Sequence, residues 1–232
     1  MFLDVHDKTS PAVQAMSFHD VEGDYSRMLI HAVSKCRVFF DVGANAGYYS
    51  LICGTLNPEA QIYSFEPIPQ TYMKLLRNIA LNSCVNVMPC SFGLSDKEGT
   101  QEMFFDAKET GAGSLRNIRG NAPVRETAKF MRLDDFTEKY GVVPDVMKID
   151  VEGSELFVLK GGIRTLTGHS PVIFIEVLRK WCRAFGHEAS DVFGLLHELG
   201  YTGHVVRGTG LEVIDSITEN TEDTNFVFRK IE

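Results

Sequence analysis

The amino-acid sequence predicts an α/β protein whose central sheet is doubly wound and mostly parallel. Two observations lead to this prediction. Short apolar segments alternate with segments that have the spacing of amphipathic helices, in the order that βαβ units require. In addition, a glycine-rich turn at residues 43–47 separates the first apolar segment from the helical segment after it, and ligands of such sheets bind at turns of this kind.

The first half of the chain is expected to form three strands with helices around them. Periodic apolar residues indicate the helices, and continuous apolar runs indicate buried strands. Pro58 should end the second helix, because proline cannot continue a helix. The expected strands are residues 37–41, 61–66 and 85–90, and the expected helices are residues 24–34, 48–56 and 71–82.

The second half is expected to add core strands and to finish with a C-terminal antiparallel hairpin. Two β-like segments, residues 100–105 and 126–133, flank a glycine-dotted stretch. We expect a lid-like insertion around residues 106–124, because connections of this length are often lids or binding loops. The other expected strands are residues 146–150, 171–176, 201–207 and 224–230, and the other expected helices are residues 134–140, 154–160 and 190–199.

Length and composition indicate a single globular domain with a short arm. We expect residues 1–22 to be a loose N-terminal arm and residues 23–232 to be one domain. The hydrophobic fraction of 44% and the charged fraction of 23% are ordinary for a soluble protein. The net charge of −8 gives the protein no general attraction to phosphate backbones, so nucleic acid is not an expected partner.

The protein is expected in the cytoplasm. Asp4 and Lys8 interrupt any apolar core near the N-terminus, so we predict no signal peptide. The most apolar run, residues 38–54, contains Asp41 and Asn45, and we predict no membrane span. The five cysteines include no Cys-x-x-Cys pair, so neither a disulfide framework nor a zinc site is expected.

The glycine-rich turn predicts a nucleoside cofactor with an amino-acid-like tail. Asp41 stands where a dinucleotide fingerprint has its first glycine, and Asn45 lies inside the turn. A carboxylate there suits a cationic group, such as the ammonium of a methionine moiety, better than a pyrophosphate. Glu66 ends the second strand, where an acidic residue commonly accepts hydrogen bonds from ribose hydroxyls. The pair predicts S-adenosylmethionine; a tight turn without a ligand is the alternative.

These motifs resemble those of FkbM-type methyltransferases, a family of the class I S-adenosylmethionine-dependent superfamily. The resemblance implies a seven-stranded Rossmann-like sheet and methyl transfer, usually to a hydroxyl oxygen of a sugar, glycan, polyketide or other natural product. The matching segments are residues 40–50, 65–67, 78–82, 111–115, 133–135, 148–155 and 175–177. The residues expected to bind the cofactor are Asp41, Gly43, Asn45, Gly47, Glu66, Pro67 and Asp150.

Carboxylates at the ends of the fourth and fifth strands are the catalytic candidates. Lys148, Asp150 and Glu152 alternate with apolar residues, which places them on one face while the strand lasts. We expect Asp150 near the methyl-donor sulfur and the incoming hydroxyl, Glu152 on the substrate side, and Lys148 as a charge partner. Glu176 ends the next strand in the same crevice. The alternative is a structural ion network with Ser154 or Glu155 capping the following helix.

A hydroxyl is a poor nucleophile at neutral pH and needs a base as the new bond forms. The catalytic candidates are therefore Asp150, Glu152 and Glu176. We expect no bound metal, although two carboxylates with this spacing are oxygen ligands that a magnesium ion accepts.

Two basic segments are expected to border the crevice and to favour an anionic acceptor. Arg116 and Arg119 lie in the expected lid, and three more cations flank Trp181 after the fifth strand. Arginine suits phosphate and carboxylate groups, and Trp181 offers an apolar wall. The substrate-binding candidates are Arg116, Arg119 and Trp181; solvated loops without a role are the alternative.

The sequence thus predicts an S-adenosylmethionine-dependent O-methyltransferase whose acceptor is a sugar, a glycan or a related small metabolite. One alternative is an RNA or protein methyltransferase, which the acidic net charge disfavours for RNA. The other is a non-catalytic scaffold that only binds the cofactor, which the intact Asp150 and Glu152 disfavour. The oligomeric state is not predicted.

Overall fold

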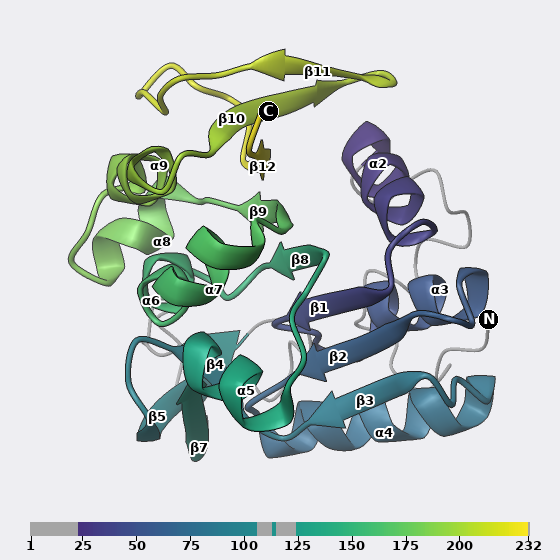
Figure 1. The fold of residues 1–232 in the computed structure, drawn as a ribbon. Coiled ribbons are helices and arrows are strands. Elements are labelled where there is room, and N and C mark those ends of the chain that lie inside the picture. Colours follow the sequence, from purple (N-terminus) through teal and green to yellow (C-terminus); the bar gives the residue numbers. More distant parts are fainter. Residues whose placement is uncertain (1–22, 106–112, 115–123, 232) are drawn as a thin grey trace.

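A computed structural model describes residues 23–105, 113–114 and 124–231, and its ribbon is drawn in Figure 1. The expected loose arm and nearly all of the expected lid lie outside these residues. Strands and helices alternate along the described chain, and the helices cover both faces of the main sheet, as the sequence predicts.

The main sheet has eight strands in the order β11-β10-β12-β9-β8-β1-β2-β3. The five strands from β9 to β3 are parallel to one another, whereas β12 is antiparallel to both β9 and β10. The prediction of seven strands is wrong by one, because the chain turns at Gly208 and folds back on β10 as β11. The strands are β1 (Val38–Val42), β2 (Gln61–Phe65), β3 (Val87–Cys90), β8 (Val146–Ile149), β9 (Val172–Glu176), β10 (Thr202–Arg207), β11 (Gly210–Val213) and β12 (Asn225–Arg229).

The helices differ from the sequence-based expectation on either side of the fifth core strand, β9. The basic segment that follows β9 was expected to be a loop, but it forms the short helix α8 (Arg179–Ala184). A further helix, α7 (Ile163–His169), was also not expected. The other helices are α2 (Gly23–Val33), α3 (Tyr48–Leu56), α4 (Pro69–Asn82), α5 (Leu133–Tyr140), α6 (Glu155–Lys160) and α9 (Ala189–Glu198).

Two apolar cores lie on opposite faces of the main sheet. One contains side chains of α2 and α3, and the other contains side chains of α5, α6, α7 and α9. Side chains alternate along each strand, so Phe39 of β1 lies in the first core and Phe40 lies in the second. By the same alternation, Asp41, Lys148 and Glu176 emerge on the face that α2 and α3 cover.

A second, four-stranded sheet has the order β4-β7-β5-β6, and its strands β4, β5 and β7 lie at the lower left of Figure 1. Its longest strands, β5 (Gly99–Phe105) and β7 (Val124–Arg132), are the β-like segments expected on either side of the lid. The sheet is completed by β4 (Gly93–Ser95) and β6 (Gly113–Ser114). It therefore holds the two ends of the segment that was expected to be a lid.

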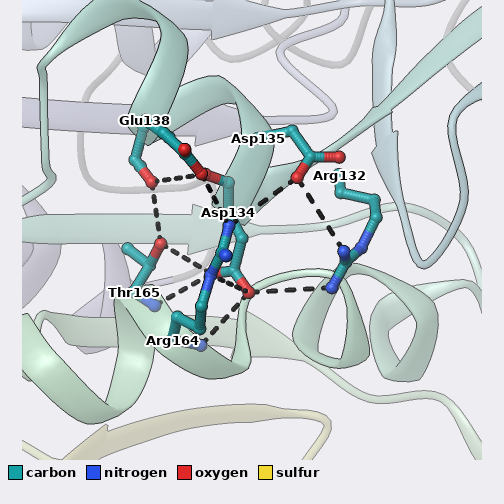
Figure 2. A network of polar contacts seen from close by, with 7 residues as sticks. Arg132, Asp134, Asp135, Glu138, Arg164 and Thr165 are labelled. Carbon is teal, nitrogen blue, oxygen red and sulfur yellow. Dashed lines mark hydrogen bonds and ion pairs between the residues drawn. The ribbon is translucent and has the colours of Figure 1, made fainter.

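Asp134, from the matching segment at residues 133–135, has a structural role at the start of α5 (Figure 2). Its carboxylate is buried and accepts hydrogen bonds from the backbone N–H of Thr165 at 2.9 Å and the hydroxyl of Thr165 at 2.8 Å. The backbone N–H of Arg164 donates to its other oxygen at 3.2 Å. Because Arg164 and Thr165 belong to the first turn of α7, Asp134 joins the starts of two helices.

No helix among the described residues is long and apolar enough to cross a bilayer.

Candidate active site

The glycine-rich turn after β1 is wedged between the ends of the two neighbouring strands. The backbone N–H groups of Gly43 and Ala44 donate to the carbonyl oxygen of Phe65, both at 3.0 Å. A Cβ atom at Gly43 would lie 2.0 Å from the backbone oxygen of Asp150, and the φ angle of Gly43 is +82°. Both observations require glycine here. The turn is thereby fixed between the carboxyl ends of β2 and β8, at the edge of the sheet where ligands of such folds bind.

The other end of this turn is equally constrained. Gly47 has a φ angle of +91°, and a Cβ atom there would lie 2.5 Å from Leu75 Cδ1. Asn45 has a φ angle of +51°, and its side-chain oxygen accepts the N–H of Ala46 at 2.7 Å. Asn78 of α4 is buried and donates to the carbonyl oxygen of Ala46 at 2.9 Å. The motif residue Asn78 therefore helps to fix the shape of the turn.

Glu66 lies at the end of β2, directly beside the turn. Its carboxylate accepts the backbone N–H of Asn45 at 3.0 Å and that of Ile68 at 2.9 Å. Burial raises the pKa of Glu66 to about 7, although these two hydrogen bonds favour the ionised form. The buried carboxylate is an acceptor placed at the position where ribose hydroxyls commonly bind.

Asp41 is more deeply buried than the sequence suggests. Its side chain accepts the backbone N–H of Ser50 at 3.1 Å and the Ser50 hydroxyl at 2.5 Å, and Ser50 also contacts the hydroxyl of Ser64 at 2.7 Å. Burial raises the pKa of Asp41, and the nearby Lys148 ammonium opposes this shift. Asp41 thus holds α3 against the sheet. Ser50 and Ser64 were not predicted, because nothing in the sequence pairs a helix hydroxyl with a strand hydroxyl.

Lys148, Asp150 and Glu176 form a polar cluster at the carboxyl ends of β8 and β9. Lys148 Nζ lies 2.8 Å from Asp150 Oδ2 and 4.8 Å from the ring centroid of Tyr49. Burial opposes ionisation of Asp150, but the ammonium of Lys148 and hydrogen bonds from Lys148 and Glu176 lower its pKa. Burial and the Asp150 charge raise the pKa of Glu176. At neutral pH, Asp150 is therefore ionised and Glu176 holds a proton that it donates to Asp150.

Glu152 does not share a strand face with Asp150. The strand β8 ends at Ile149, and Glu152 has a φ angle of +54°, so the alternation that the sequence suggested stops before it. Glu152 is nevertheless close enough to Glu176 for its charge to contribute to the raised pKa of Glu176. A left-handed residue without glycine's freedom is strained, and such strain is concentrated at functional turns.

The turn after Asp150 is held by Glu155. The carboxylate of Glu155 accepts the backbone N–H groups of Val151 at 3.3 Å and Gly153 at 3.0 Å, and burial raises its pKa to about 7. Ser154 makes no side-chain cap at the start of α6. A Cβ atom at Gly153 would lie 2.8 Å from the ring of Phe185, so this turn packs directly against the end of α8.

A cleft of about 900 Å³ lies beyond the end of β9, between α8 and residues 217–224, and Trp181 lines it. Arg116 and Arg119, the other predicted substrate-binding residues, lie outside the described part of the chain. Pro67 follows Glu66, and a Cβ atom added at Gly93 would lie 3.3 Å from Pro67 Cγ. Within residues 23–105, 113–114 and 124–231, no group of three His, Cys, Asp or Glu side chains is placed to hold a metal ion.

Comparisons with known proteins show the family to which the chain belongs. A family model described as the methyltransferase FkbM domain matches residues 41–202. The chain is 33% identical over 178 residues to hexuronic acid methyltransferase AglP of Haloferax volcanii, an alignment that covers 76% of this chain and 68% of AglP. It is 28% identical over 145 residues to 2-O-methyltransferase NoeI of Sinorhizobium fredii, covering 56% of this chain and 59% of NoeI.

Among solved structures, the fold is similar to that of methyltransferase FkbM from Methylobacillus flagellatus KT. The TM-score is 0.50 at 17% sequence identity, and the match covers 83% of this chain and 43% of that chain. At this identity the likeness concerns the fold alone.

Proposed function

Since the chain belongs to the FkbM methyltransferase family, we propose that it transfers a methyl group from S-adenosylmethionine to a hydroxyl of a sugar or glycan. The family and the cofactor that the sequence predicted are confirmed by this membership. The acceptor is our proposal. It is supported by the similarity to AglP, named a hexuronic acid methyltransferase, and to NoeI, named a 2-O-methyltransferase.

The residues of the turn after β1 fit the cofactor. Glycine at positions 43 and 47 lets the turn pack against the backbone of Asp150 and the side chain of Leu75, and Glu66 presents a buried carboxylate beside it. We propose that Glu66 accepts the ribose hydroxyls and that Gly43, Asn45, Gly47 and Pro67 shape the surrounding walls. When bound, S-adenosylmethionine supplies a methyl group on a positively charged sulfur.

The role that we propose for Asp41 differs from the one predicted from the sequence, which was a direct interaction with the ammonium group of the cofactor. Its carboxylate is 1% exposed and is engaged by Ser50. We propose that it favours the cationic cofactor through its negative charge, while Asp150, whose side chain is 29% exposed, is the carboxylate that the ligands reach.

The observation that carries the proposed chemistry is the hydrogen-bonded pair of Asp150 and Glu176. An acceptor hydroxyl loses its proton as its oxygen gains the methyl group, and a positioned base speeds such a step by about 10²- to 10⁴-fold. Asp150 is ionised at neutral pH, so it is the group that takes this proton. Glu176 donates to Asp150 and orients it, Lys148 balances its charge, and Glu152 faces the acceptor side.

A transfer assay tests the proposal. Radiolabelled donor should methylate free or linked sugars and should not label RNA or protein. Asp150→Asn should lower kcat by about 10²- to 10⁴-fold, and the exposed control Glu98→Gln should leave it unchanged. Label in RNA or protein but not in sugars would contradict the acceptor class. An unchanged kcat in Asp150→Asn would contradict the base assignment.

A further inference from the structure

The turn after β8 carries a strained residue beside the catalytic pair. Glu152 has a φ angle of +54°, a left-handed conformation that disfavours any residue with a Cβ atom. Burial and the charge of Asp150 are the main causes of the raised pKa of Glu176, and the charge of Glu152 adds to them. A strained residue persists only where the surrounding structure holds it. The position of the Glu152 carboxylate beside Glu176 therefore depends on the contacts that fix this turn.

Side chains fix the peptide groups of the turn on both sides of the strained residue. The Glu155 carboxylate accepts the backbone N–H groups of Val151 at 3.3 Å and Gly153 at 3.0 Å, and the Ser154 hydroxyl donates to the carbonyl oxygen of Val151 at 3.0 Å. The carbonyl oxygen of Gly153 lies 3.0 Å from Nε2 of His187, which is 34 residues away along the chain. A carbonyl oxygen only accepts, so Nε2 is the donor. His187 thus ties the turn to the segment beyond β9.

His187 has a well-fixed place from which to hold the turn. Its backbone N–H donates to the carbonyl oxygen of Cys182 at 3.3 Å, and its Nδ1 lies 3.2 Å from the carbonyl oxygen of Glu188. The ring packs edge to face with Phe157 of α6, with 5.8 Å between the ring centroids. Glu188 is the N-cap residue of α9, and its backbone N–H donates to the Asp191 carboxylate at 2.8 Å. The imidazole is therefore anchored by α6 and by the corner between α8 and α9.

The packing around Gly153 makes this hydrogen bond important. Gly153 is buried and has a φ angle of +100°. A Cβ atom there would lie 2.8 Å from the ring of Phe185 and 2.9 Å from the backbone carbon of Trp181, so the turn is pressed against the end of α8. A buried carbonyl oxygen needs a hydrogen-bond partner, and His187 provides it.

We infer that His187 is a positioning residue of the active site, which holds Gly153 and thereby keeps the Glu152 carboxylate beside Glu176 and toward the acceptor. The inference rests on the proposed function, because it takes Asp150 and Glu176 as the catalytic pair. His187 touches no reacting group in this role and acts through the turn. A change at His187 should therefore matter only while residue 152 carries its charge.

A titration of the side-chain carboxyl carbons, followed by NMR, tests the inference without any acceptor. The negative charge of Glu152 opposes ionisation of Glu176, so Glu152→Gln should lower the pKa of Glu176. His187→Ala should lower this pKa too, because the released turn moves the carboxylate away. In the double variant, His187→Ala should add nothing to the effect of Glu152→Gln, which is the non-additivity of two residues that act together. Asp150 and Lys148, the other charges that face Glu176, are the same in all four proteins.

Two further variants separate the hydrogen bond from a general effect on the fold. His187→Gln keeps an N–H donor and should leave the pKa of Glu176 near that of the parent protein. His169→Ala, at an exposed histidine that ends α7, is the matched control and should also leave it unchanged. The amide spectrum of each variant reports whether it is folded.

Three outcomes of the titration would overturn the inference. The pKa of Glu176 would be the same in His187→Ala as in the parent protein, or it would be unmoved by Glu152→Gln. Alternatively, His187→Ala would cause a shift of equal size with and without the charge at residue 152, which would mean that His187 acts on the fold in general.

The inference and the proposed function fail in different ways. A pKa of Glu176 that depends on His187, in a protein that methylates no sugar, would support the role of His187 and contradict the proposed function. Methyl transfer to sugars by a protein in which Glu176 titrates equally with and without His187 would do the reverse. For a sugar that is methylated, His187→Ala should raise its KM by up to about tenfold, as expected for the loss of one hydrogen bond. An equal KM would contradict the placement of Glu152 toward the acceptor.

Discussion

Asp150 and Glu176 share a hydrogen bond although they end two different strands, and the pair holds one proton at neutral pH. Lys148, at 2.8 Å from Asp150, decides which of the two is ionised, because its ammonium stabilises the nearer carboxylate. The pair resembles other carboxyl pairs in enzymes, in which like charges at close range force one pKa up.

This pairing predicts the pH dependence of catalysis. A lowered pKa keeps Asp150 ionised at acidic pH, so kcat of the parent protein should stay flat from pH 7 down to about the ordinary aspartate value of about 3.9. Lys148→Met removes the cation that lowers this pKa, so the acidic limb of the kcat profile should move to higher pH. Lys148→Arg keeps the positive charge, so the acidic limb should stay at the same low pH as in the parent protein. A limb at the same pH in all three proteins would contradict the role of Lys148.

Glu176 should behave as a donor rather than as a base. Its raised pKa means that it is protonated at neutral pH and loses its proton only in the alkaline range. The amide of Glu176→Gln also donates a hydrogen bond, so this variant should retain most of kcat at pH 7, in contrast to Asp150→Asn. A loss of 10²-fold or more in Glu176→Gln at pH 7 would instead identify Glu176 as the base.

Glu66 is expected to contribute strongly to cofactor affinity. Hydrogen bonds to a charged group contribute roughly 1.5 to 3 kcal/mol each, so Glu66→Ala should weaken S-adenosylmethionine binding at least about tenfold in calorimetry. Glu66→Gln keeps one oxygen that accepts a backbone N–H. This variant therefore shows whether weaker cofactor binding comes from the lost charge or from loss of the local fold. The exposed control is Glu59→Gln. An unchanged Kd in a folded Glu66→Ala protein would place the ribose elsewhere.

Gly43 should tolerate no side chain, whereas another left-handed glycine should. Gly43→Ala would set a Cβ atom 2.0 Å from the Asp150 carbonyl oxygen, and we expect at least about 3 kcal/mol of destabilisation together with loss of cofactor binding. Gly208 also has a positive φ angle, of +58°, but nothing lies within 4 Å of its Cβ position. Gly208→Ala should therefore lower the free energy of unfolding by only about 1–2 kcal/mol. Urea denaturation of both variants measures the difference, and equal values would contradict the clash.

Asp134 is expected to act on stability and not on catalysis. Its side chain is 1% exposed and accepts hydrogen bonds from the first turn of α7, with Arg132 Nη2 3.7 Å away (Figure 2). Asp134→Asn should lower the free energy of unfolding by about 1–3 kcal/mol, because the amide keeps one oxygen acceptor but sets an N–H donor where the backbone N–H of Arg164 needs an acceptor. Asp135→Asn, at a side chain that is 39% exposed, should change stability by no more than about 0.5 kcal/mol. If the two variants were equally stable, Asp134 would not join the helices.

The sequence by itself determined the order of the parallel core strands, the glycine-rich turn, and the acidic residues at the ends of β2, β8 and β9. These features follow from local patterns, since apolar periodicity, proline and glycine act within a few residues of the chain. The additional strand β11 and the helix α8 escaped prediction because β11 is largely exposed and α8 is only six residues long, so neither leaves a clear periodic pattern.

Only the tertiary structure decided which of these groups meet. Because β9 lies beside β8 and β12 lies beside β9, Glu176 reaches Asp150 and the segment before Asn225 faces α8. Strand order also brings Lys148 beside Asp41. The direction of each pKa shift depends on burial and on neighbours that are distant in the chain, which no local pattern encodes. The sequence therefore names the carboxylates, and the packing of the sheet decides which of them is ionised.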